Sequence, residues 1–334
     1  MKNTFIAVFF LVIFSIFGQQ KHYKNLVFEG AGIRGIAYAG VVRILEETHL
    51  LDSIENVGGT SAGAIVAGMI AVGYNSKEIE NIIGSTKFRK FNHGGCGICR
   101  LKKHFGWYRS DRFRDFLAKL IADKTGNTDI TFKELAENKA YKSLYVTGTS
   151  INQQKTIVFS AENYPDMKIV DAIRISMSIP LYFEAIFIDK KGNVFKKFQP
   201  DKQLDVMVDG GILANFPIFI FDKYQNKNGQ KIRVENMETL GIRIDSDEQI
   251  KQDAVDQQLI SYEVKDFKGF TEAFYILVLE NLNRNKLTQA DWARSVSVSS
   301  KKIGPRIKKL SEAQKQLLIE SGREGMMRFL KRYE

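Results

Sequence analysis

Apolar and polar positions follow two different periods along most of the 334 residues. Short apolar runs bounded by turn residues predict strands, at 26–28, 54–57, 144–151, 156–160, 185–188, 205–208, 240–244 and 295–298. Longer stretches with helical spacing predict helices, at 36–48, 64–72, 76–83, 111–122, 131–138, 171–178, 262–286 and 311–332. Interleaved strands and helices predict an α/β fold, three-layer α/β/α with a mostly parallel central sheet.

Two details of this pattern make separate predictions. Strands 144–151 and 156–160 are rich in β-branched and aromatic residues, and we expect them to pair with each other. Residues 84–109 carry no clear period and are expected to be irregular. Ser110 stands directly before the helix at 111–122 and is expected to be its N-cap.

The first 20 residues differ in kind from the rest. A short polar start carrying Lys2 precedes an apolar run of 13 residues at 5–17, which is interrupted only by Ala7 and Ser15. That length is short for a membrane span, which needs about 20 residues, but it matches the hydrophobic region of a signal peptide. We expect residues 1–20 to be a signal peptide that directs export. The alternatives are an N-terminal membrane anchor or a buried strand or helix.

Charge narrows the range of partners. Lys and Arg number 49 against 38 Asp and Glu, which gives a net charge of +11. Such a surface suits anionic lipid headgroups or nucleic acid. The basic residues form small separate clusters, and no signature of a nucleic-acid-binding module accompanies them. We therefore expect solvated faces or a membrane-facing rim, and no nucleic-acid partner.

The first chemical motif is a serine turn. Residues Gly59 to Gly63 read GxSxG and stand between the predicted strand 54–57 and the predicted helix 64–72. In a nucleophile elbow this turn lifts the serine hydroxyl out of the sheet and places it at a helix N-terminus, where the dipole stabilises negative charge. Ser61 is the candidate nucleophile. The pattern alone is also common in ordinary turns.

The second motif is the glycine turn at 30–35, which fits GxGxxG. A dinucleotide site would need an acidic residue about 20 positions later, at the end of the second strand. The nearest acidic residues, Glu46, Glu47 and Glu55, lie at a helix end or before that strand. We therefore expect the loop amides to stabilise an oxyanion. The loop consists of Gly30, Ala31, Gly32, Ile33, Arg34 and Gly35. Its arginine either adds positive charge there or braces the loop by pairing with a carboxylate.

A nucleophilic serine needs a base. The four histidines are His22, His49, His93 and His104. None stands late in the chain, where the usual α/β-hydrolase order places the histidine. A triad through His93 or His104 would require the segment 84–109 to fold back onto the serine. Asp209 follows the strand 205–208 and precedes Gly210 and Gly211. A carboxylate at the end of a strand lies on the edge where α/β sheets assemble their sites. With Ser61 at the end of a neighbouring strand, we expect a direct contact between the two side chains. Asp209 is therefore the candidate base for Ser61, provided that burial raises its pKa from about 3.9. A plain turn is the alternative.

These three motifs, in this order, resemble the patatin-like phospholipase family. Residues 171–180 (DAIRISMSIP) and 106–111 (GWYRSD) are also similar to segments of that family. The resemblance implies lipid acyl hydrolysis without a metal or cofactor, with Ser61 as nucleophile, Asp209 as base and the loop 30–35 as oxyanion hole. One departure is that an alanine stands second in this loop, where many members have glycine.

The resemblance covers about residues 24–245, which we expect to form the catalytic domain. Residues 246–334 are expected to form an α-rich C-terminal extension packed on it. The expected partners are a lipid substrate and, peripherally, a membrane surface. A non-catalytic membrane-associated binding protein with the same fold is the alternative function, and a nucleotide-binding oxidoreductase is a more distant one.

Both cysteines and two histidines fall within residues 93–104, in the order His93, Cys96, Cys99, His104. Structural zinc sites usually separate their ligand pairs by a dozen or more residues, so we expect no metal. In an exported chain a Cys96–Cys99 disulfide is favoured. Two free thiols are the other alternative.

Overall fold

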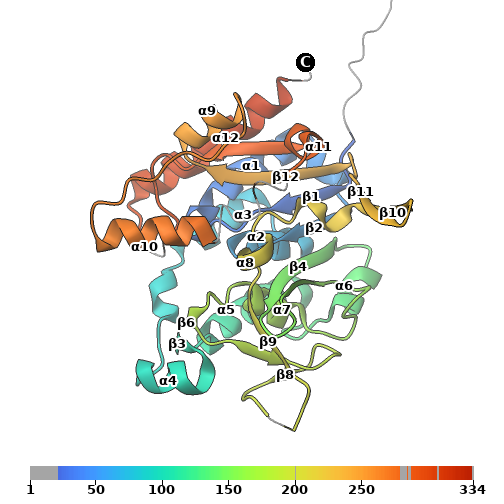
Figure 1. The fold of residues 1–334 in the computed structure, drawn as a ribbon. Coiled ribbons are helices and arrows are strands. Elements are labelled where there is room, and N and C mark those ends of the chain that lie inside the picture. Colours follow the sequence, from blue (N-terminus) through green and yellow to red (C-terminus); the bar gives the residue numbers. More distant parts are fainter. Residues whose placement is uncertain (1–21, 200, 279–283, 285–286, 307, 333–334) are drawn as a thin grey trace, which may run out of the picture.

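The computed structural model describes residues 22–199, 201–278, 284, 287–306 and 308–332. A nine-stranded sheet lies at its centre, in the order β13-β12-β1-β2-β4-β9-β7-β8, with β5 paired to β4 (Figure 1). The strands are β1 Asn25–Phe28, β2 Asn56–Gly59, β4 Ser143–Ser150, β5 Lys155–Phe159, β7 Ile186–Ile188, β8 Val194–Phe195, β9 Asp205–Asp209, β12 Thr239–Asp245 and β13 Ser295–Ser299. The predicted α/β class with its mostly parallel central sheet is confirmed.

The five strands β13, β12, β1, β2 and β4 are parallel to one another. In this part Phe28 at the end of β1 lies opposite Gly59 at the end of β2. The glycine turn and the serine turn, which follow these two residues, therefore leave the sheet side by side. The remaining pairings, β4 with β5 and β9, and β7 with β8 and β9, are antiparallel. The predicted pairing of β4 with β5 is confirmed.

Sixteen helical elements accompany the sheet in the described residues. They are η1 Gly32–Ile36, α1 Ala37–Glu47, η2 Leu50–Ser53, α2 Ala62–Ala71, α3 Ser76–Ser85, η3 Phe88–Phe91, α4 Gly97–His104, α5 Asp111–Thr125, α6 Phe132–Glu137, α7 Ile169–Ser176, α8 Gly211–Ala214, η4 Ile218–Phe221, α9 Asp247–Asp253, α10 Phe267–Ile276, α11 Gln289–Ala293 and α12 Glu312–Leu330. Among the described residues, no helix combines the length and the hydropathy needed to span a membrane.

The two faces of the sheet are covered differently, as β12 shows. Leu240, Ile242 and Ile244 point into the main core, which they share with apolar residues of α1, α2, α7 and α12. The alternate residues point to the other face. There the Arg243 guanidinium lies over the rings of Phe216 and Trp292, at 5.4 and 4.8 Å from the ring centroids. The helices η4 and α11 belong to this second, thinner layer.

Helix α12 buries most of its apolar residues within the fold. Leu318, Met326 and Phe329 are buried in the main core. Where α12 crosses α1, Gly322 leaves no room for a Cβ against the Ala37 carbonyl, and Gly40 leaves none against the Ile319 carbonyl. The backbones of the two helices are therefore in direct contact. Most of the apolar face of this helix is thus occupied within the fold.

Several predictions of secondary structure need correction. The stretch 84–109 is not irregular, because it contains η3, α4 and the strand β3 Gly106–Tyr108, which pairs with β6 Leu181–Phe183. The helix predicted at 262–286 begins only at Phe267, because the Asp266 side chain accepts the Gly269 N–H at 2.6 Å and so caps it. Part of its predicted end, like the predicted signal peptide at 1–20, lies outside the described residues. The hairpin of β10 Lys223–Lys227 and β11 Gln230–Val234 was not predicted.

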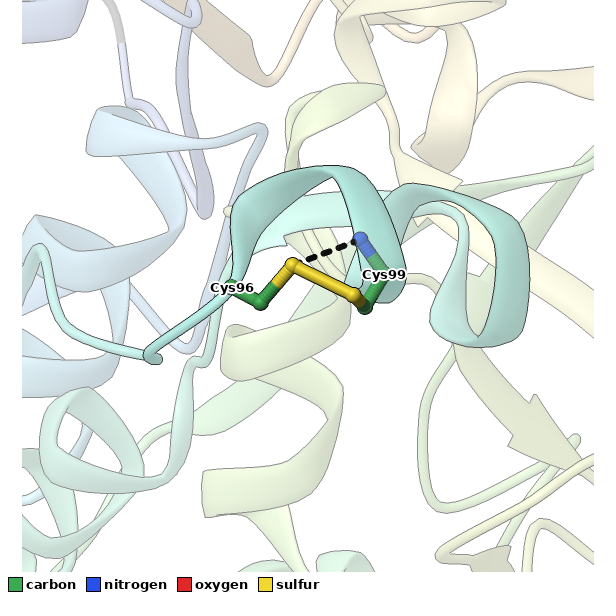
Figure 2. The surroundings of a disulfide bond; sticks show 2 residues. All are labelled: Cys96 and Cys99. Carbon is green, nitrogen blue, oxygen red and sulfur yellow. Dashed lines mark hydrogen bonds between the residues drawn. A yellow bond between two sulfur atoms is a disulfide. The ribbon is translucent and has the colours of Figure 1, made fainter.

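Cys96 and Cys99 form a disulfide across the first turn of α4 (Figure 2). The Cys96 sulfur also accepts the backbone N–H of Cys99 at 3.3 Å. His93, from the same sequence cluster, lies 2.5 Å from the Asp111 carboxylate. In this arrangement neither cysteine is available as a thiolate ligand, which is the form that zinc requires.

Candidate active site

Ser61 occupies a strained turn between β2 and α2. Its φ and ψ are +53° and −122°, a sparsely populated conformation with positive φ that costs a non-glycine residue about 1–3 kcal/mol. The turn is tight because a Cβ on Gly63 would lie 2.5 Å from the carbonyl oxygens of Phe28 and Glu29. The predicted arrangement of strand, sharp turn and helix around Ser61 is therefore present.

Three groups hold the serine. Its backbone N–H donates to Ser176 Oγ at 2.8 Å. Its hydroxyl donates to Asp209 Oδ2 at 2.9 Å and lies 3.4 Å from the Met177 sulfur. Ser176 and Met177 stand at the end of α7, and sequence reasoning missed their contact with Ser61. The only signal for it was the likeness of residues 171–180 to a family segment, which gave no role to either side chain.

Asp209 is buried, and two groups bond to its carboxylate. Besides the Ser61 hydroxyl on Oδ2, the Gly211 N–H donates to Oδ1 at 2.7 Å. Burial raises the pKa of Asp209 to about 7, and these two hydrogen bonds oppose the rise without cancelling it. The condition set by the sequence, a buried carboxylate with a raised pKa, is therefore met in the structure.

Asp209 reaches the serine by a route different from the expected one. We expected Asp209 to end a strand beside that of Ser61, at the carboxyl edge of a parallel sheet. Instead β4 separates β9 from β2, and β9 runs antiparallel to β4. Gly148 of β4 lies opposite Asp209, two residues beyond Val146, which lies opposite Gly59. The end of β9 therefore comes level with the turn that carries Ser61.

The glycine turn uses several of its own amides. The N–H groups of Gly30, Ile33 and Arg34 donate to backbone carbonyls of Asn215, Pro305 and Ala31, at 2.9, 3.1 and 3.2 Å. Within the described part of the chain, the amides of Ala31 and Gly32 have no such acceptor. Gly32 has a φ of +55°, and a Cβ there would overlap the Pro305 carbonyl. A segment near the C-terminus thus fixes the shape of this loop.

The Arg34 side chain bonds back to the glycine turn that carries it. Its side chain is buried, and its Nε donates to the Ala31 carbonyl at 3.1 Å. Burial alone would raise the pKa of Asp245, but the positive charges of Arg243, Arg284 and Arg34 lower it below its ordinary value. Of the two roles considered for Arg34, the structure therefore favours the brace.

The histidines lie elsewhere. His49 pairs with Asp52 at 3.1 Å and His93 pairs with Asp111. His104 lines a separate polar cavity. All four histidines belong to the described residues, and none of the contacts of Ser61 is with a histidine. Among the described residues, the ionisable group bonded to the serine hydroxyl is therefore a carboxylate, that of Asp209.

The serine opens into a mainly apolar cavity of about 370 Å³. Its walls come from the glycine turn, α2, α3, η3, the segment from the end of α7 to β6, and two C-terminal residues, Tyr275 of α10 and Arg306. The lining residues are Gly32, Ile33, Gly35, Ile36, Ser61, Ala62, Ile65, Ile83, Phe88, Met177, Ile179, Tyr182, Tyr275 and Arg306. Such a lining suits a long apolar group with one reactive polar end.

A family model described as "Patatin-like phospholipase" matches residues 26–222, a stretch that holds all three motifs. The chain belongs to the patatin-like phospholipase family. In Bacillus subtilis (strain 168), the uncharacterized protein YqhO is 33% identical over 216 residues, which are 61% of this chain and 69% of that one. The probable lipid hydrolase 463L of Invertebrate iridescent virus 6 is 29% identical over 214 residues, 64% of this chain and 68% of that one.

The fold also matches a solved structure. The crystal structure of VipD from Legionella pneumophila aligns with a TM-score of 0.60 and 17% sequence identity, over 93% of this chain and 67% of that one. At this identity the match shows a common fold. The aligned regions span about two thirds of the length of these relatives.

Proposed function

We propose that the protein is a lipid acyl hydrolase that cleaves carboxylic esters through an acyl-enzyme. One observation carries the proposal, the 2.9 Å hydrogen bond from Ser61 Oγ to Asp209 Oδ2 at an apolar cavity large enough for an acyl chain. Membership of the patatin-like phospholipase family and the relative named as a probable lipid hydrolase support the substrate class.

The first step forms the acyl-enzyme. Ser61 Oγ attacks the acyl carbonyl carbon while its proton passes to Asp209 Oδ2. A carboxylate whose pKa is about 7 is a far better base than an ordinary aspartate, and about half of it is ionised at neutral pH. The amides of Ala31 and Gly32 are the available donors of the glycine turn for the resulting oxyanion, which the N-terminus of α2 also stabilises.

The second half releases both products. The bond between the acyl carbon and the alcohol oxygen breaks, and Asp209 returns its proton to the leaving alkoxide. Water then attacks the acyl-Ser61 ester, Asp209 accepts a proton from it, and the fatty acid leaves as Ser61 regains its hydrogen. Each proton passes through one carboxylate, so this scheme needs no metal or cofactor.

Helix α10 has an exposed apolar side that would suit an enzyme acting at a lipid surface. Its side chains Phe267, Phe270, Phe274 and Leu277 are 80, 54, 58 and 52% exposed, and their spacing places them on one side of the helix. Tyr275 of the same helix lines the cavity that holds Ser61. An exposed apolar stripe on a helix that also contributes a wall residue to the acyl site fits insertion into a membrane interface. We infer that α10 contacts the bilayer from which the substrate is drawn.

Covalent labelling tests the nucleophile. A fluorophosphonate should add to Ser61 with loss of fluoride, and peptide mass spectrometry should find the adduct on that residue alone. Ser61→Ala should not react, and Asp209→Asn should react at least about 100-fold more slowly, because it lacks the base. Ser178→Ala is the matched control and should label normally, because only its backbone carbonyl bonds to Asp209. A label on another serine, or none on folded protein, would contradict the proposal.

A further inference from the structure

A second cavity, of about 450 Å³, adjoins the one that holds Ser61. The two share four wall residues, Ile33, Ile36, Ile83 and Phe88. The first cavity is mainly apolar, whereas the second is lined by six basic side chains and one acidic one. The basic residues are Lys87, Arg89, Lys90, Lys308, Lys309 and Lys315, and the acidic residue is Glu312.

The positive charge in this basic cavity is mostly uncompensated. Glu312 pairs with Lys315 at 2.6 Å, so its charge is already used. For the other five basic residues, no ion pair with a described carboxylate is present. They come from two segments far apart in the sequence, residues 87–90 at η3 and residues 308–309 just before α12. The fold therefore gathers like charges beside the cavity of Ser61, an arrangement that an anionic ligand would stabilise.

The shared wall limits what such a ligand can be. Ile33 and Ile36 belong to η1, the segment that also carries the glycine turn. A molecule with its ester carbonyl at Ser61 and its acyl chain in the apolar cavity needs only to cross this wall to reach the lysines. A glycerophospholipid has this form, because its phosphate lies a few bonds from the ester. Galactolipids and neutral glycerides have no charge to place there.

We propose that the basic cavity binds the phosphate of an anionic phospholipid whose acyl ester lies at Ser61. This inference rests on the proposed lipid acyl hydrolysis and adds a substrate class to it. Lysine ammonium groups serve as mobile point charges for a phosphate, and Arg89 adds a planar donor that can bond two of its oxygens. Phospholipids with a net negative headgroup are therefore the preferred substrates, ahead of neutral lipids with the same acyl chains.

The test compares two short-chain substrates below the concentration at which they aggregate, so that attraction to a surface plays no part. They are dihexanoyl phosphatidylglycerol and dihexanoylglycerol. In Lys308→Gln/Lys309→Gln, kcat/KM for the phospholipid should fall by roughly tenfold, while kcat/KM for the neutral ester should stay the same. Lys87→Gln/Lys90→Gln, from the opposite wall, should give the same pattern. All four lysines are exposed, so these changes leave the core intact.

The control removes the same charge elsewhere. Lys223→Gln/Lys227→Gln lies on the exposed β10–β11 hairpin, on the opposite side of the molecule from α10 (Figure 1), and should leave both rates unchanged. The inference is overturned if the cavity variants keep their rate on the phospholipid, if they lose both substrates equally, or if they lose activity only on vesicles. Each of these results leaves ester hydrolysis at Ser61 intact. Failure of the proposed function would instead appear as no hydrolysis of either ester by the unaltered protein.

Discussion

At the scale of single residues, the burial of Asp209 suits its proposed role as a base but lowers the stability of the folded protein at neutral pH. Its burial raises the pKa to about 7, whereas an aspartate in the unfolded chain titrates near 3.9. Between these two pH values the folded protein keeps a proton that the unfolded chain releases. The free energy of unfolding therefore falls as pH rises from about 4 to about 7, and it stays lowered above that. The proposed base is thus kept at a cost in stability.

Replacing Asp209 by Asn should remove this cost. The Asn side chain does not ionise in this pH range, so the stability of the variant does not depend on this titration. The free energy of unfolding of Asp209→Asn minus that of the unaltered protein should therefore increase between pH 4 and pH 7.5, by on the order of 4 kcal/mol. Urea unfolding at both pH values measures the difference. Asp201→Asn, at an exposed position, is the control and should show little change. Parallel stability profiles for Asp209→Asn and the unaltered protein would rule out a raised pKa.

The sequence predicts the chemical groups of the site better than it predicts their surroundings. Ser61 and Asp209 carry local patterns, a strand followed by a glycine turn, and the structure brings them into contact. Ser176 and Met177 carry no pattern that distinguishes them from other helix-end residues, yet both contact the serine. Pro305 closes on the glycine turn from about 270 positions away. Such contacts depend on the tertiary fold, which local periodicity does not encode.

At the scale of elements, α10 differs most from its expectation. The sequence predicts a long amphipathic helix at 262–286, and helical periodicity alone cannot tell whether an apolar side faces a core or solvent. The described helix is shorter, and its apolar stripe is exposed. Helix α12, which raised the same question, buries its apolar residues against α1 and β13. The element proposed to meet a membrane is therefore α10.

Replacing Phe270 and Phe274 of α10 by serine should weaken binding to the bilayer. Cosedimentation with phosphatidylglycerol vesicles should fall by roughly tenfold or more, because two exposed aromatic side chains lose their insertion energy. Turnover of a soluble short-chain ester should not change. The matched control is Leu317→Ser/Met327→Ser, which alters two half-exposed apolar residues of α12. Unchanged cosedimentation of the α10 variant, or an equal loss in the control, would refute contact through α10.

At the scale of the whole molecule, buried charges tie the C-terminal part to the rest. Arg294 pairs with Asp222 at 2.8 Å and with Asp291 at 2.7 Å, and all three side chains are almost fully buried. Arg284 pairs with Asp245 at 2.6 Å. Strand β13 adds to the parallel part of the sheet, and Pro305 shapes the glycine turn. The family model ends at residue 222, yet later residues complete both the sheet and the candidate site.

Strand and helix positions could be predicted for most of this sheet, but the order of its strands could not. The apolar runs at 26–28, 205–208 and 240–244 each mark a strand, and nothing local indicates that β12 lies beside β1 or that β9 runs antiparallel to β4. Those pairings depend on which faces fit together after collapse. The buried ion pairs are equally hidden, because in the sequence their members resemble any other surface charges.

The central claim is that Ser61, with Asp209 as its base, hydrolyses lipid esters. Fatty-acid release from phosphatidylglycerol vesicles by the unaltered protein and by Ser61→Ala tests it most directly, with thermal unfolding of both to show that each is folded. We expect steady release by the unaltered protein and loss of at least about 1000-fold in Ser61→Ala. The other hydroxyl of the turn, that of Thr60, is fully buried and bonded to Thr147 and to the Ala214 carbonyl, so it cannot replace Ser61. Folded Ser61→Ala that still releases fatty acid at a comparable rate would contradict the account.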